Sequence, residues 1–155
     1  MHEIIYNPAL VPEFEGNPLI EALPPILSQS DIIRDIRIRP KRLKDVRSQT
    51  PQVRIMNAQQ ILRFHQPLQA DMMLATGIDK CLRWGYADRN PMTPEYVRML
   101  NERYEARLDG ALPYRRGFSK TYGFSVLGVS GVGKSTTSEL ILRRYEPLIR
   151  HSSYK

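Results

Sequence analysis

The chain has 155 residues, of which 41% are hydrophobic and 25% are charged, and its formal net charge is +7. Length and composition are those of a globular protein with a core of its own, and the positive charge favours an acidic partner such as nucleic acid. No apolar run approaches the ~20 residues of a membrane span, so we expect no membrane partner.

The compartment is predicted from the single cysteine and from the N-terminal sequence. Cys81 stands alone, which excludes an intrachain disulfide and favours a reducing environment. The first residues contain neither the basic segment nor the apolar segment of a secretory signal. We therefore expect a cytoplasmic protein.

Residues 1–50 are predicted to form an extended, proline-rich arm followed by a basic connector. Proline excludes a long helix or a central strand near the start, where it occupies positions 8, 12, 18, 24 and 25. Residues 1–27 are too apolar for a disordered tail, so we expect them to lie across another part of the protein. Residues 34–47 hold seven basic side chains against two acidic ones. This run fits either a nucleic-acid contact or a solvated linker.

Residues 51–155 are predicted to be a helical segment that leads into the start of a P-loop domain. One helix starts at Pro67 and ends near Gly85, with apolar residues at three- and four-residue steps. A second opens at Thr93 and Pro94 and runs to Gly110, with one apolar face formed by Val97, Leu100, Tyr104 and Leu108. A loop is expected over residues 111–121.

The end of the chain suggests an α/β fold. The sequence YGFSVLGV, residues 122–129, has the apolar character of a buried parallel strand, with Phe124, Val126 and Leu127 inside. A third helix is expected to begin within GKSTTSELILRRYEP and to stop before Pro147. We thus predict the first strand, the P-loop and the first helix of an incomplete P-loop NTPase domain.

The candidate site is the loop from Gly128 to Ser135, which matches G-x-x-x-x-G-K-[ST]. A triphosphate needs backbone N–H groups around it, so Gly131 and Gly133 are expected to adopt positive φ at the start of a helix. Lys134 would reach the β- and γ-phosphates of ATP, and the Ser135 hydroxyl would bind Mg²⁺. The predicted nucleotide-binding residues are Gly128, Gly131, Val132, Gly133, Lys134, Ser135 and Thr136.

The alternative to a nucleotide site is a glycine-rich turn that binds nothing. At average residue usage, a chain of this length shows the four fixed positions by chance on the order of 1% of the time, which favours the nucleotide site. Hydrolysis needs more, because a carboxylate on a neighbouring strand must hold the metal and position water. No such strand follows Ser135, so we assign no catalytic residue and expect no turnover by this chain alone.

Several further elements resemble the TnsC and TniB family of AAA+ ATPase regulators of DNA transposition. They are the segment GNPLIEALPP at residues 16–25, Gln66-Pro67-Leu68, Gly85-Tyr86, Arg89-Asn90-Pro91 and the P-loop at its distance from them. The resemblance covers residues 7–147. It implies an ATP-dependent homo-oligomer on DNA that links a target-selector protein to the transposase. Family members continue into Walker B, sensor, arginine-finger and lid elements, which residues 1–155 do not contain.

Three functional hypotheses follow. The first is the ATP-binding portion of such a regulator, and the second is a module that docks partner proteins or DNA without ATPase activity of its own. The third, a small-molecule kinase, would need an acceptor pocket and a lid. Tyr86 and Arg89 could approach the adenine or a neighbouring protomer. An aromatic residue at the end of a helix is more often part of the core, however, and the same holds for Trp84.

Overall fold

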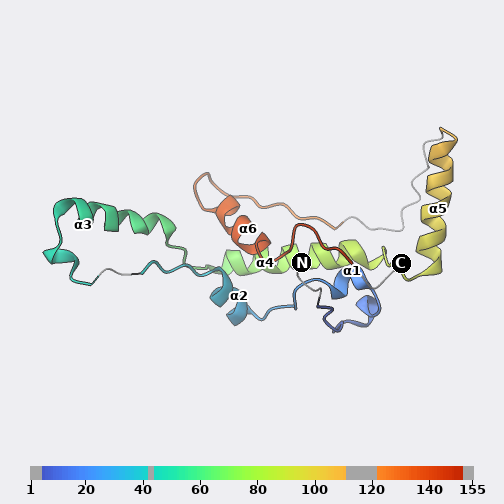
Figure 1. Cartoon of the computed structure of the whole chain (residues 1–155), viewed down its shortest axis with the longest axis horizontal. Helices are drawn as coiled ribbons and strands as arrows, with labels where there is room; N and C mark the ends of the chain where they lie inside the picture. Colours follow the sequence, from blue (N-terminus) through green and yellow to red (C-terminus); the bar gives the residue numbers. More distant parts are fainter. Residues whose placement is uncertain (1–4, 42–43, 111–121, 152–155) are drawn as a thin grey trace.

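The chain is a helical protein organised along one central helix, as a computed structural model shows for residues 5–41, 44–110 and 122–151. Helix α4, the longest, lies in the middle of the molecule (Figure 1). The described elements are η1 (Pro12–Phe14), α1 (Pro18–Glu21), α2 (Gln29–Ile36), η2 (Val46–Ser48), α3 (Pro51–Ala58), η3 (Gln59–Arg63), α4 (Gln69–Ala87), α5 (Pro94–Leu108) and α6 (Lys134–Leu142).

The predicted α/β fold with a first strand is wrong. The described residues contain no strand, and their one β-type pairing is an isolated antiparallel bridge between Ile38 and His65. Residues 123–129 are extended but unpaired, and Leu127 is 92% exposed. An apolar sequence makes a strand only when a neighbouring strand accepts and donates its backbone hydrogen bonds, and none lies beside this segment within the described chain.

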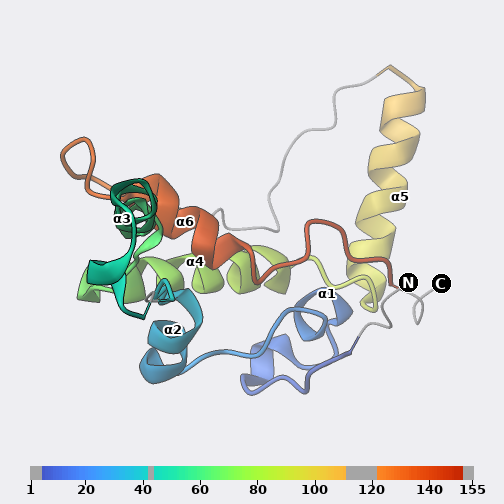
Figure 2. The ribbon, with the colours of Figure 1, turned by 60° about the vertical axis from the view of Figure 1, so that its left-hand side comes forward.

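The core forms where α2 and α6 pack against α4 (Figure 2). Its buried side chains are Ile32 and Ile36 from α2, Leu74 and Ala75 from α4, and Ile141 from α6. The predicted helix after Pro67 is present, but it continues through Gly85 to Ala87, because nothing forces a glycine within a helix to end it. The helix predicted to stop before Pro147 is α6.

Helix α2 is fixed at its start by a local hydrogen-bond exchange. The Ser28 hydroxyl accepts from the Asp31 backbone N–H at 3.2 Å and donates to Asp31 Oδ2 at 2.6 Å. The hydrogen bond from Ser28, together with the nearby positive charge of Arg34, lowers the pKa of Asp31. This N-cap turns the extended chain into a helix at the point from which Ile32 and Ile36 reach the core.

The N-terminal arm does lie across another part of the protein, the C-terminal half of α4. Phe14 is buried and meets the Trp84 ring edge-on, with ring centroids 5.0 Å apart. Asn17, which is 1% exposed, donates from Nδ2 to the Tyr86 carbonyl at 2.9 Å and accepts at Oδ1 from the Leu19 N–H at 3.1 Å. One amide side chain thus caps α1 and attaches it to α4.

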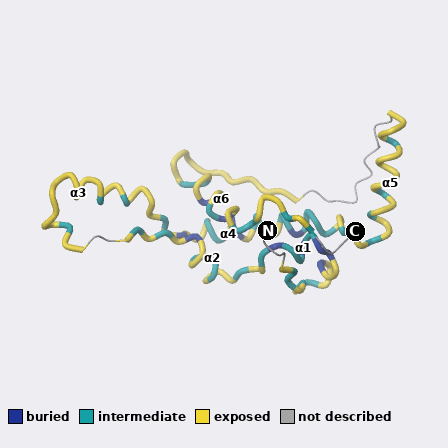
Figure 3. The backbone as a smooth tube through the Cα atoms, in the orientation of Figure 1, coloured by how far each residue is buried: buried dark blue, intermediate teal, exposed yellow. Residues whose placement is uncertain are grey.

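Two helices project from this centre, at the two ends of the long axis (Figure 1). Helix α5 begins after Thr93 and ends at Leu108, as predicted, but none of its residues is buried and its apolar face is exposed (Figure 3). Helix α3, which the sequence analysis did not specify, packs mainly on η3. No helix in the described part of the chain is both long and apolar enough to cross a membrane.

Candidate functional site

The glycine-rich loop has the backbone conformation that the motif predicts. Gly131 has φ +83° and Gly133 has φ +87°, and Gly133 is the N-cap of α6. A Cβ atom at either glycine would meet nothing within 4 Å, so glycine is required there for its left-handed backbone and not for space. The expectation of positive φ at both positions is confirmed.

Lys134 closes the loop on itself. Its Nζ donates to the carbonyl oxygens of Gly128 at 2.9 Å and of Val129 at 2.8 Å, so the ammonium group lies across the start of the loop. These acceptors are neutral carbonyls at the surface, whereas a phosphate oxygen is negatively charged and would form a stronger hydrogen bond that is also an ion pair. The loop therefore holds a cation that an anion could draw away from its two carbonyls.

The remaining predicted residues surround the start of α6. Val132 is exposed in the loop, and Ser135 and Thr136 are exposed in the first turn of the helix. The loop projects beyond the end of α6 (Figure 2), so its glycines and hydroxyls are open to solvent. The structure thus brings all seven predicted residues together, in one loop and one helical turn.

Asp71 joins the first turn of α6 to the start of α4, a role that the sequence analysis missed. Its Oδ1 accepts from the hydroxyl of the buried Thr137 at 3.0 Å, and its Oδ2 accepts from the Leu68 N–H at 2.8 Å. His65 Nε2 lies 3.7 Å from Oδ2 and makes no hydrogen bond within the described chain. One signal of this role is present in the sequence, an acidic residue three positions after the N-cap of a helix.

The other end of α6 is also held in place. The Tyr145 hydroxyl donates to Asp79 Oδ1 at 2.9 Å, and Arg83 Nε donates to Asp79 Oδ2 at 2.9 Å. Burial, followed by the negative charge of Asp79, raises the pKa of Tyr145, which keeps the hydroxyl protonated as a donor. Arg144 Nε contributes an ion pair with Asp35 of α2 at 3.1 Å. Helix α6 is therefore attached to α4 near both of its ends and to α2 near its C-terminal end.

The structure does not bring Tyr86 and Arg89 to the loop. The first turn of α6 contacts Asp71 near the start of α4, whereas Tyr86 lies in the last turn of the same helix. At roughly 1.5 Å per residue, the intervening helix is on the order of 20 Å long. Trp84 packs between Phe14 and Tyr122, with centroid distances of 5.0 and 5.8 Å. Packing is thus the observed role of Trp84, and an adenine contact by Tyr86 or Arg89 is not supported.

The described chain offers the loop no preformed metal site, because no group of three or more His, Cys, Asp and Glu side chains in it could hold an ion. A magnesium ion here would depend on the Ser135 hydroxyl, phosphate oxygens and water. No protein-family model matches the chain, and a search of the curated proteins finds no match.

Proposed function

We propose that this chain binds ATP with Mg²⁺ at Gly128–Ser135 and is the ATP-binding portion of a cytoplasmic regulator of DNA transposition. The observation that carries the proposal is the loop itself, with two left-handed glycines and a lysine at the N-terminus of α6. In the proposed role the protein assembles as a homo-oligomer on DNA in the presence of ATP and links a target-selector protein to the transposase.

The loop residues fit a triphosphate in three respects. The open space at Gly131 and Gly133 leaves room for an anion close to the backbone. Nine residues of helix follow Gly133, and their aligned dipoles favour negative charge at the loop. Lys134 supplies the cation, and Ser135 supplies a hydroxyl for Mg²⁺. The binding free energy of ATP would stabilise the ATP-bound conformation of the protein, and Mg²⁺ would neutralise negative charge on the phosphates.

The biological role rests on the resemblance, and two hydrogen bonds support it. Asn17 donates to the Tyr86 carbonyl, and Asn90 Nδ2 donates to the Gly16 carbonyl at 3.1 Å. Three of the sequence segments that carry the resemblance are thus neighbours in space. A shared structural role would explain why they occur together.

The alternative is a module that docks partner proteins or DNA and has no ATPase activity of its own. It is favoured by the exposure of the loop and by the position of the positive charge, which lies far from the loop along the chain, in residues 34–47. The two functions are compatible in one protein, because they use different surfaces.

Nucleotide binding to the purified chain tests the proposal directly. A fluorescent ATP analogue is titrated with Mg²⁺ into wild type, Lys134→Ala and Lys80→Ala, the last being a control that removes an exposed lysine of α4. A charge-assisted hydrogen bond is worth about 1.5–3 kcal/mol, so Lys134→Ala should weaken binding ~10- to ~150-fold, while Lys80→Ala should not change it.

Equal affinity of the wild type and Lys134→Ala, or no binding by a wild type shown to be helical by circular dichroism, would remove the nucleotide site from the proposal. Chelation of Mg²⁺ and Ser135→Ala should each weaken binding, and their effects should not add, since both remove the same metal contact.

A further inference from the structure

The net positive charge of the protein is carried by one projecting part, which we call the basic lobe, residues 37–65. It contains eight of the 23 basic residues and one of the 16 acidic residues, Asp45, so the rest of the chain carries 15 of each. The basic residues are Arg37, Arg39, Lys41, Arg42, Lys44, Arg47, Arg54 and Arg63, of which Arg42 lies outside the described residues. The lobe thus accounts for the whole net charge of +7.

The lobe starts and ends at one point. Ile38 and His65 exchange two backbone hydrogen bonds of 3.0 Å, so the chain leaves the centre of the molecule and returns to it beside itself. Between these residues, η2, α3 and η3 extend away from α4 (Figure 1). The junction lies next to Asp71, and beyond it the lobe is free to contact another molecule.

The lobe also exposes an unusual amount of apolar surface. The exposed fraction is 62% for Ile55, 69% for Met56, 73% for Ile61, 84% for Leu62 and 51% for Phe64. Exposed apolar side chains that gather in one place mark interaction surfaces more often than isolated ones do. Neither α3 nor η3 contains an acidic residue, so this surface combines apolar and positive character.

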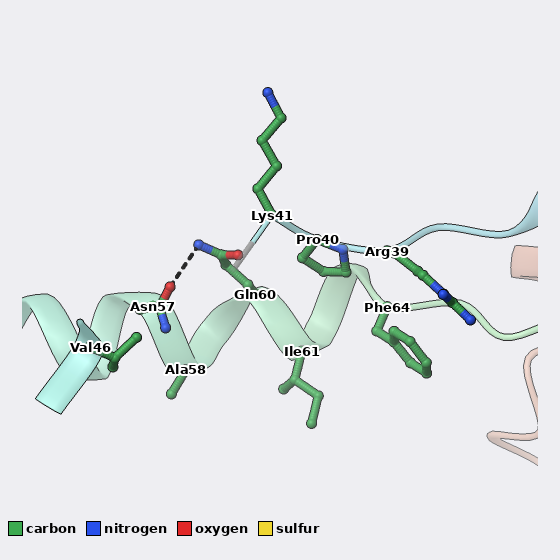
Figure 4. Close-up of a pocket in the computed structure, with 9 residues that line it drawn as sticks. All are labelled: Arg39, Pro40, Lys41, Val46, Asn57, Ala58, Gln60, Ile61 and Phe64. Carbon is green, nitrogen blue, oxygen red and sulfur yellow. Dashed lines mark hydrogen bonds between the residues drawn. The ribbon is translucent and has the colours of Figure 1, made fainter. Parts of the chain in front are cut away.

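Part of this surface forms an open groove of about 890 Å³. Its apolar lining comes from Pro40, Val46, Ala58, Ile61 and Phe64. Ala58, Ile61 and Phe64 project on the same side of the lobe, and Arg39 lies beside Phe64 (Figure 4). Lys41 also borders the groove, but its side chain projects on the opposite side (Figure 4).

We propose that the basic lobe is a docking site for an acidic amphipathic helix of a partner protein. Such a helix presents an apolar stripe to the groove and carboxylates to the surrounding arginines and lysines. The charge of the lobe selects against basic and neutral helices. The proposal is independent of nucleotide binding, because Lys134 and the lobe belong to different parts of the chain.

Nucleic acid is the competing occupant, and the apolar side chains decide against it. Phosphates are neutralised by the eight cations alone, and that contact would leave Ile61, Leu62 and Phe64 exposed to water. An amphipathic helix satisfies both properties of the lobe at once.

The test measures fluorescence anisotropy of labelled probes added to the full chain. The probe is a designed peptide of about 20 residues, long enough to form a helix, with leucine on one face and glutamate on the others. A peptide with lysine in place of each glutamate and a short duplex DNA of random sequence are the comparisons. The acidic peptide should bind, and its affinity should fall as salt is added.

Two variants of the lobe separate the contributions. The double variant Ile61→Ser, Phe64→Ser should weaken peptide binding about tenfold or more, because it removes apolar anchors. The double variant Arg39→Glu, Lys41→Glu should weaken binding and flatten its salt dependence. Leu100→Ser, Tyr104→Ser in α5 is the control. Both of these residues are exposed and lie outside the lobe, so the variant should leave binding unchanged.

The results distinguish an acidic helix from nucleic acid as the occupant of the lobe. Peptide binding that is lost in both lobe variants and kept in the α5 control and in Lys134→Ala supports the proposal. Absence of binding by the acidic peptide, equal binding of the lysine peptide, or loss equal to that of the lobe variants in the α5 control overturns it. DNA binding that charge reversal weakens, without peptide binding and without an effect of Ile61→Ser, Phe64→Ser, would assign the lobe to nucleic acid instead.

Discussion

The centre of the molecule and its projecting parts are held by different forces. Around α4, the helices share buried side chains, and Ile36 and Ile141 are 2% and 1% exposed. The basic lobe and α5 contain no buried residue among their helices, and their apolar side chains face solvent (Figure 3). Tertiary packing therefore fixes the centre, whereas α3 and α5 are specified locally, each starting with a proline at its N-terminus.

This contrast also separates stability from binding. Substitutions at the centre should change the free energy of unfolding, while substitutions in the projecting parts should change interactions with other molecules and little else. The glycine-rich loop and α6 combine the two, because α6 is anchored to the core by Thr137 and Ile141 while most of the loop before it is exposed.

The largest effect on stability is expected for Ile141→Ala. The side chain packs among α2 and α4, and its truncation removes buried apolar area and leaves a cavity, at a cost of about 2–5 kcal/mol in the free energy of unfolding. The Leu62 side chain is 84% exposed and contributes little buried apolar area. Leu62→Ala should therefore change the free energy of unfolding by less than about 0.5 kcal/mol. Chemical denaturation followed by circular dichroism measures both.

Similar losses of stability for Ile141→Ala and Leu62→Ala would mean that the lobe is packed as firmly as the centre. The proposed difference between the two regions would then be wrong. If Ile141→Ala does not fold, Ile141→Val gives the same ordering with a smaller cost of about 0.5–1.5 kcal/mol.

An intermediate effect is expected where the N-terminal arm meets α4. Asn17→Ala removes both a helix cap and a buried hydrogen bond to the Tyr86 carbonyl, and should cost about 2 kcal/mol. Asn90→Ala removes two exposed hydrogen bonds, one to the Gly16 carbonyl and one from the Met92 N–H, and should cost less than about 1 kcal/mol. Thermal unfolding compares the two variants. Equal shifts in Tm would show that the burial of Asn17 adds nothing to the stability of the protein.

Local signals in the sequence predicted α4, α5 and α6, but not α1 and α2. Thr93 and Pro94 placed the start of α5, and the positive φ of Gly131 and Gly133 followed from the motif. These features depend on backbone conformation and on neighbours along the chain. The basic run at residues 34–47 was interpreted as either a nucleic-acid contact or a solvated linker, and α3, which follows it, was not specified.

The error at residues 123–129 shows what a local pattern cannot provide. Phe124, Val126 and Leu127 have the composition of a buried strand, but pairing depends on another segment to complete the hydrogen bonds. The contact of Thr137 with Asp71 was missed for a related reason, since the two residues are 66 positions apart and only the packing of α6 on α4 brings them together. Long-range contacts of this kind leave no spacing rule in the sequence.

Small effects of opposite sign are expected when the same substitution is made at two glycines. Gly85 lies within α4 with open space where a Cβ would be, so Gly85→Ala reduces the freedom of the unfolded chain and should stabilise the protein by about 0.5–1 kcal/mol. Gly133 also has open space, but its φ of +87° disfavours any side chain, so Gly133→Ala should destabilise by about 1–2 kcal/mol.

The pair is informative because space is the same at both positions and only the backbone differs. Denaturation midpoints of the two variants, measured without nucleotide, give the sign directly. If Gly133→Ala were neutral, the loop would not need its left-handed turn for folding, and the conformation at the start of α6 would then be one that the exposed loop adopts among several. If Gly85→Ala stabilises and Gly133→Ala destabilises the protein, the left-handed backbone at Gly133 is required for folding. That position is also the one where the proposed nucleotide approaches the backbone.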